Sequence, residues 1–168
     1  MSTTAPRANP RTGPFIATKE HRRFVEFVDA VRREAFIGLC FGPAGVRVGK
    51  TLSARRYANW DIAQALVEDW GPRDDSDAKV YAALARSRTV FYTPAVKTSQ
   101  KQLIDDLSEL VLHVDLCIEQ HLKPPGEKRR RYPDHHAALI VIDEAERLTA
   151  PQLEYLRDRL TAASSGCS

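Results

Sequence analysis

The stretch Phe41-Gly42-Pro43-Ala44-Gly45-Val46-Arg47-Val48-Gly49-Lys50-Thr51 decides how the rest of the chain is interpreted. It follows a short apolar run, Ala35 to Phe41, which favours a buried strand, and it leads into a helical pattern that begins near Gly49. A glycine-containing turn between a strand and a helix lets successive backbone N–H groups surround a phosphate. In such a loop the lysine reaches the terminal phosphates and the threonine hydroxyl is a ligand for Mg²⁺.

The spacing of this loop departs from the standard pattern, in which four residues separate the first glycine from Gly-Lys-Thr. Six residues separate Gly42 from Gly49, and three separate Gly45 from it. Either Ala44 takes the position of the first glycine, or two residues such as Arg47-Val48 are inserted into the loop. A strand–helix turn that binds nothing is the third alternative. The sequence leaves all three open.

A second motif follows 91 residues after Thr51, where the apolar run Ala138–Ile142 leads into Asp143 and Glu144. A carboxylate at the C-terminal end of a strand is a suitable ligand for nucleotide-bound Mg²⁺. The next carboxylate can orient and deprotonate an attacking water. A core strand followed by an acidic helix cap is the alternative for this segment alone. Together, and in this order, the two motifs predict a P-loop protein.

The remaining segments predict an α/β protein with a three-layer αβα arrangement. Capping patterns at Ser99 with Gln102, and at Thr149 with Gln152, mark the starts of two helices. Strands separated by helices predict a parallel sheet covered on both faces. The expected helices are 18–34, one from about 50, 62–70, 78–86, 99–123 and one from 149, and the expected strands are 35–41, 89–93 and 138–142.

The chain of 168 residues is long enough for one domain. We expect a flexible leader at 1–14, a nucleotide-binding domain at 15–160 and a disordered tail at 161–168. The longest apolar run, Ala137–Ile142, is too short to cross a bilayer, and the first 14 residues lack the apolar region of a secretory signal. We therefore expect a cytoplasmic protein without membrane partners. Cys40 and Cys117 are expected to be small core residues, since the cysteines match no metal spacing.

The charges are distributed unevenly along the chain. Residues 1–60 contain 11 basic and 4 acidic side chains, whereas residues 61–168 contain 14 and 18. A basic segment can follow the phosphate backbone of a nucleic acid, although solvated helix faces are the simpler interpretation. The same two interpretations apply to Lys128–Arg131. We expect His135 and His136 not to bind metal, and Trp60 and Trp70 to lie at core edges.

The segments Phe36–Gly45, Gly49–Ala58, Val90–Pro94 and Ile140–Leu148 resemble AAA+ ATPases of the TniB/TnsC/MuB transposition type. Motifs typical of GTPases, ABC-type ATPases and helicases are absent from the sequence. The resemblance implies an origin-recognition-like AAA domain that binds ATP and Mg²⁺, acts on double-stranded DNA, directs a transposase to its target and assembles with further copies of itself.

The resemblance also implies the site residues. Lys50 and Thr51 would contact phosphate, Thr51 and Asp143 would hold Mg²⁺, and Glu144 would activate water. The nucleotide-binding positions would be Gly42, Ala44, Gly45, Gly49, Lys50 and Thr51.

Three departures from the family pattern limit the expected activity. The phosphate loop is lengthened, no further strand follows the 149–160 helix, and neither an arginine finger nor a helical lid follows. In the family that further strand separates the P-loop strand from the strand that ends at Asp143. We therefore expect a domain incomplete at its C-terminus, with weak or no hydrolysis alone. The alternative function is a non-hydrolysing remnant that binds DNA or a full-length partner.

Overall fold

The computed structural model describes residues 16–41, 49–70, 75–123 and 133–165. Two parallel strands lie at its centre, β1 (Thr89–Tyr92) and β2 (Leu139–Ile142), in a register that places Thr89 opposite Leu139. Within the described ranges no third strand pairs with either of them. The helices are α1 (Lys19–Glu34), α2 (Lys50–Tyr57), α3 (Trp60–Glu68), α4 (Ala78–Ser87), α5 (Gln100–Leu122) and α6 (Ala150–Ser165), with short 3-10 turns η1 (Asp75–Asp77) and η2 (Ala145–Arg147).

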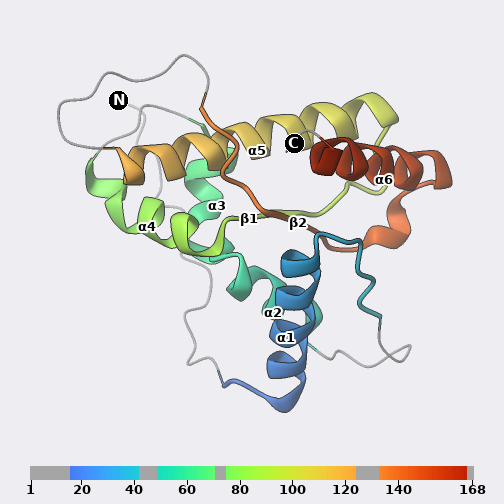
Figure 1. The fold of residues 1–168 in the computed structure, drawn as a ribbon, viewed down its shortest axis with the longest axis horizontal. Coiled ribbons are helices and arrows are strands. Elements are labelled where there is room, and N and C mark those ends of the chain that lie inside the picture. The colour runs from blue at the N-terminus through green and yellow to red at the C-terminus, as the bar shows by residue number, and fades with distance from the viewer. Residues whose placement is uncertain (1–15, 42–48, 71–74, 124–132, 166–168) are drawn as a thin grey trace, which may run out of the picture.

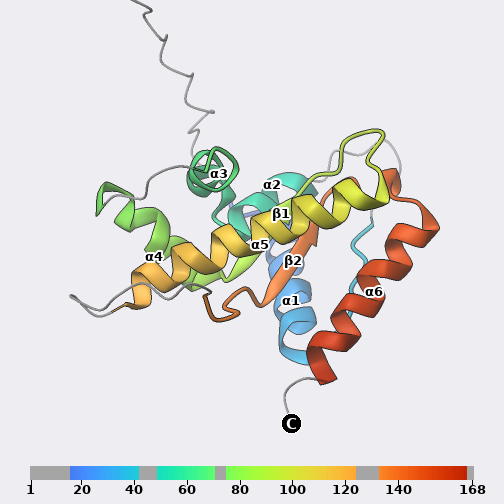
Figure 2. The ribbon, with the colours of Figure 1, turned by 90° about the horizontal axis from the view of Figure 1, so that it is seen from above.

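Helices lie on both sides of the strand pair. In Figure 1, α5 and α6 lie above the two strands, and α1 and α2 lie below them. Seen from above, α5 crosses over the strands and α6 lies beside it (Figure 2). The parallel pairing and the helices on either side confirm the predicted α/β class, and they are compatible with a P-loop fold.

The predicted helix starts are confirmed by their caps. The Thr18 hydroxyl accepts a hydrogen bond from the His21 N–H at 3.2 Å, and the Ser99 hydroxyl accepts one from the Gln102 N–H at 3.1 Å. At α6 the Gln152 side chain reaches back to the Thr149 N–H at 2.8 Å. Helix α6 continues to Ser165, past the expected start of the tail at 161, through a segment with two alanines that favours helix.

The core lies where α3, α4 and α5 meet β1. Trp60, Leu84, Val90 and Cys117 are at most 1% exposed. A smaller cluster forms around Leu107 between α5, the end of β1 and the start of α6. All four residues of β1 are buried, whereas all four of β2 are half-buried. The pair of strands is therefore shielded well on the β1 side and poorly on the β2 side.

The expected strand at 35–41 is wrong. Ala35 adopts a left-handed conformation (φ 50°) that ends α1, and the following residues form no strand. The backbone at Gly38 passes so close to α1 that an added Cβ would collide with the side chains of Phe27 and Val31. This segment lies against α1 and pairs with neither of the two strands. A strand without a partner has backbone N–H and C=O groups that can bond only to water, so it is not stable alone.

The exposure of this segment also corrects the expected burial of Cys40. Leu39 is 75% exposed and Phe41 is 90% exposed, and Cys40 between them is exposed as well. Cys117, in contrast, is fully buried as expected.

Candidate functional site

Helix α2 begins directly after the segment that the sequence predicts to be a phosphate loop. Gly49 is the N-cap, with φ 67° and ψ 21°, a left-handed conformation that glycine adopts without steric cost. Its carbonyl oxygen accepts the N–H of Ser53 at 2.8 Å, so that the first turn of α2 is closed. Lys50 follows as the first helical residue and is half-buried, while Thr51 is exposed.

Three of the predicted loop positions, Gly42, Ala44 and Gly45, lie outside the described residues. The choice between the two loop alignments is therefore untested, and the predicted roles of these residues remain predictions.

The turn after β2 places two acidic residues at the end of the strand. The Asp143 N–H donates to the carbonyl oxygen of Tyr92 at 2.9 Å, which extends the pairing of β1 and β2 by one residue. Glu144 follows with φ 53° and ψ 41°. A non-glycine residue in this left-handed region costs about 1 kcal/mol or more, so neighbouring contacts have to stabilise the turn.

Arg147 supplies those contacts. Its Nη1 donates to the carbonyl oxygen of Pro94, just beyond β1, at 2.9 Å, and its Nη2 lies 3.8 Å from Oε2 of Glu144. The guanidinium therefore joins the turn after β2 to the segment after β1. Sequence reasoning assigned no role to Arg147; the only signal was a basic residue directly after three carboxylates.

The carboxyl groups of Glu144 and Glu146 influence each other. The hydrogen bond that the protonated Glu144 donates to Glu146, followed by the charge of Glu146, raises the pKa of Glu144 above its ordinary value. The pKa of Glu146 is lowered, first by a backbone hydrogen bond and then by its bond with Glu144, with the Lys50 ammonium among the positive charges that add to this. A carboxylate with a raised pKa is the stronger base.

The arrangement suits a divalent cation held jointly with a phosphate group. Mg²⁺ in such sites takes one or two protein oxygens and completes its shell with phosphate oxygens and water. The exposed hydroxyl of Thr51 and the half-buried carboxylate of Asp143 are donors of that kind. No group of three or more His, Cys, Asp or Glu side chains within the described ranges is arranged as a metal cage.

Several basic residues of the N-terminal third are engaged within the protein. Arg32 donates to the carbonyl oxygen of Ser87 at 3.0 Å, and Arg33 pairs with Glu34 at 2.9 Å. Both Arg55 and Arg56 lie near the Asp61 carboxylate, at 2.9 and 3.8 Å. Arg22 and Arg23 are exposed on α1. The positive charge available on the described surface is thus smaller than the sequence total, and Lys128–Arg131 lies outside the described residues.

The histidines before β2 take part in a structural contact. The N–H groups of His136 and Ala137 donate to the buried carboxylate of Asp115 at 2.9 and 2.7 Å. His135 lies with Nδ1 3.6 Å from the same carboxylate, and its side chain is 95% exposed. Asp115 therefore fixes the chain that enters β2 to α5. Sequence reasoning did not single out Asp115.

No helix in the described part of the chain is both long enough and apolar enough to span a membrane.

Comparisons with known proteins identify the family of the chain. The AAA domain family matches residues 31–168 of the chain. A Staphylococcus aureus protein named "Potential ATP-binding protein" is 38% identical over 148 residues, an alignment that covers 85% of this chain and 53% of the relative. The chain thus spans about half the length of that curated relative. No solved structure matches this chain.

Proposed function

The chain belongs to the AAA domain family, and from this premise we propose that it binds ATP with Mg²⁺ between the start of α2 and the turn after β2 and hydrolyses the bound ATP. The relative named as a potential ATP-binding protein supports the choice of nucleotide. One structural observation supports the proposal. Lys50 and Thr51 begin α2 directly after the left-handed Gly49. Asp143 and Glu144 directly follow the end of β2. One motif thus stands at a helix start and the other at a strand end, where a phosphate and its metal ion are commonly held.

Each residue has a distinct role in this proposal. Backbone N–H groups at Gly42, Ala44, Gly45 and Gly49 surround the phosphates, where the N-terminus of α2 also favours negative charge. Lys50 neutralises the terminal phosphates. Thr51 and Asp143 hold Mg²⁺, which supplies charge neutralisation at the phosphate oxygens when bound. Glu144 accepts a proton from the attacking water.

We further propose that this activity serves DNA transposition, in the choice of a target site. The likeness to transposition ATPases of the TniB/TnsC/MuB type and the excess of basic residues over 1–60 support this. Double-stranded DNA, a transposase and further copies of the chain are then its partners.

A second candidate is a domain that binds DNA or a full-length partner without hydrolysing ATP. It is favoured by the position of residues 36–41, which lead into the phosphate loop but lie outside the sheet. A phosphate site depends on rigid support, and residues 36–41 supply no strand for it.

Two substitutions test the first proposal. Lys50→Ala is expected to weaken ATP binding at least about tenfold, because it removes a charge from the phosphates. Glu144→Gln is expected to keep binding and remove turnover, because the amide is not a base. Calorimetric titration with Mg-ATP and phosphate release measure the two effects.

Lys97→Ala, at an exposed lysine outside the site, is the matched control and should change neither quantity. Unchanged ATP affinity in the Lys50 variant would contradict the proposed site. Tight binding without turnover in the unsubstituted chain would favour the second candidate.

A further inference from the structure

The side chain of Arg147 contacts two segments that leave the strand pair at the same edge. Its Nη1 donates to the carbonyl oxygen of Pro94 at 2.9 Å, and Pro94 is less than 2% exposed. Its Nη2 lies 3.8 Å from Oε2 of Glu144. Because β1 and β2 are parallel, Pro94 and Glu144 both follow the carboxyl end of a strand. The guanidinium is therefore anchored on a buried carbonyl and in contact with the proposed base.

The backbone of the turn after β2 holds Arg147 in this position. The Arg147 N–H donates to the carbonyl oxygen of Glu144 at 3.0 Å, and the Leu148 N–H donates to that of Ala145 at 3.1 Å. Leu148 is 8% exposed and belongs to the buried cluster around Leu107. Since the turn is closed by hydrogen bonds and the residue after it is buried, the backbone of Arg147 is fixed relative to Glu144.

The distance between Arg147 and Glu144 suits a carboxylate that has to accept a proton. At 3.8 Å the contact between Nη2 and Oε2 is longer than a hydrogen bond. The positive charge attracts this oxygen while its lone pairs stay available to a water molecule. The Glu144 side chain is 42% exposed. A glutamate that open to solvent and without such a partner samples several rotamers, and aligning it for reaction costs free energy.

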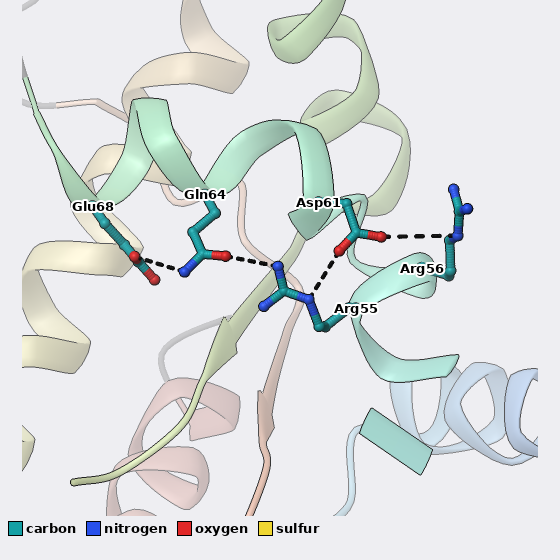
Figure 3. Close-up of polar contacts among 5 residues, drawn as sticks. All are labelled: Arg55, Arg56, Asp61, Gln64 and Glu68. Atoms are coloured by element: carbon teal, nitrogen blue, oxygen red, sulfur yellow. Dashed lines mark hydrogen bonds and ion pairs between the residues drawn. The ribbon is translucent and has the colours of Figure 1, made fainter. Parts of the chain in front are cut away.

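Arg55 is already committed to other contacts and does not replace Arg147. Its guanidinium also lies beside β1, 5.5 Å from the centre of the Phe91 ring. However, its Nε donates to Oδ1 of Asp61 at 2.9 Å, and its Nη2 donates to the side-chain oxygen of Gln64 at 2.7 Å (Figure 3). Both bonds direct Arg55 toward α3. We therefore expect Arg55 not to compensate for the loss of Arg147.

We propose that Arg147 is a positioning residue for Glu144, which it holds, from its anchor on Pro94, in the orientation that accepts the proton of the attacking water. This inference rests on the proposed function, in which Glu144 is the base. Glu144 contacts the water, and Arg147 acts only through Glu144. Loss of Arg147 should therefore slow the chemical step and leave nucleotide binding unchanged.

The turnover of each nucleotide-binding site tests the proposal. Calorimetric titration of the full chain with Mg-ADP counts the binding sites, so that unfolded protein does not enter the rate, and phosphate release from Mg-ATP gives kcat and KM. Arg147→Met should lower kcat per site about ten- to hundredfold, because a misdirected base slows proton transfer. KM should stay within about twofold of its original value.

Two further variants separate positioning from stability. Arg147→Lys keeps the charge but lacks the planar fork that reaches both partners, and it should lower kcat per site at least about threefold. Asp115→Asn is the matched control, since Asp115 fixes the chain that enters β2, at the other end of the strand from Glu144. We expect it to destabilise the protein about as much as Arg147→Met does, and to leave kcat per site unchanged.

Several results would overturn the inference alone. These are an unchanged kcat per site in a folded Arg147→Met chain, a rise in KM in place of the fall in kcat, and an equal fall in kcat in Asp115→Asn. If Arg147→Met does not fold, an unchanged kcat per site in Arg147→Lys overturns it as well. A failure of the proposed function looks different: the unsubstituted chain releases no phosphate, or Glu144→Gln releases it undiminished, and the inference then falls with it.

Discussion

Single side chains determine the geometry of the turn after β2. Glu144 has a left-handed backbone, and Arg147 ties its carboxylate to the carbonyl oxygen of Pro94 across 53 positions of sequence. The strained residue is itself the proposed base, and strained residues are common at functional sites, where the surrounding contacts impose a conformation that the residue alone disfavours. The geometry of this turn therefore depends on Arg147.

Removing the Arg147 guanidinium should destabilise the protein. In Arg147→Met the buried Pro94 carbonyl loses its donor, and we expect a loss of about 1–2 kcal/mol in the free energy of unfolding. Urea denaturation measures it. Arg33→Met removes an exposed ion pair and should cost less than about 0.5 kcal/mol. Equal losses in both variants would show that the turn does not depend on Arg147.

Tyr92 should make stability depend on pH in alkaline solution. Burial, and then the hydrogen bond and charge of Asp106, raise its pKa to about 12 from an ordinary value near 10. Below about pH 10 the hydroxyl is protonated in both the folded and the unfolded chain, and its stabilisation is fully present. As the pH rises toward 12 the unfolded chain ionises first, so the free energy of unfolding falls.

The Tyr92→Phe variant isolates this effect. Urea denaturation from about pH 9 to pH 12 should show a shallower loss of stability in the variant than in the unsubstituted chain. Parallel curves would mean that Tyr92 titrates alike in both states.

At the scale of elements, caps and one buried carboxylate fix how helices meet strands. Ser99, Thr18 and the Thr149–Gln152 pair mark helix starts by bonds within four residues, which is why the sequence predicts them. Asp115 acts over a longer range. It is 2% exposed and accepts two N–H groups from the chain that enters β2.

Asp115→Asn should weaken the contact between α5 and β2. The amide oxygen can still accept both N–H groups, which now bond to Oδ1, but the acceptor loses its charge, so we expect a loss of about 1–2 kcal/mol. Thermal and urea unfolding measure the loss. The control is Asp105→Asn at an exposed position of the same helix, which should leave the free energy of unfolding almost unchanged. If Asp115→Asn were as stable as the unsubstituted chain, the role given to this carboxylate would be wrong.

For the whole molecule, the main feature is an uneven sheet. β1 is enclosed by α3, α4 and α5, while β2 is half-buried and the apolar segment 36–41 lies exposed along α1. An apolar stretch that gains nothing from burial in this structure should tolerate truncation of its side chains.

The same substitution at two leucines tests whether residues 35–41 form the buried strand that the sequence predicts. Leu39→Ala, at a 75% exposed position, should change the free energy of unfolding by less than about 0.5 kcal/mol, whereas Leu107→Ala, at a fully buried one, should cost about 2–5 kcal/mol. Urea denaturation of both variants measures these two changes. A large loss at Leu39 would restore the buried strand that the sequence predicts.

The sequence by itself determined the helices, the two paired strands, their parallel arrangement and the order of the Lys50-Thr51 and Asp143-Glu144 motifs. These follow from periodicity and from caps, whose hydrogen bonds join residues close together in the chain. Tertiary structure alone decided that 35–41 forms no strand, because a strand depends on partners far away in sequence. It also decided that Arg55 pairs with Asp61 and that the buried Asp115 accepts two N–H groups from the chain that enters β2, since the environment of a charge is set by which elements pack around it.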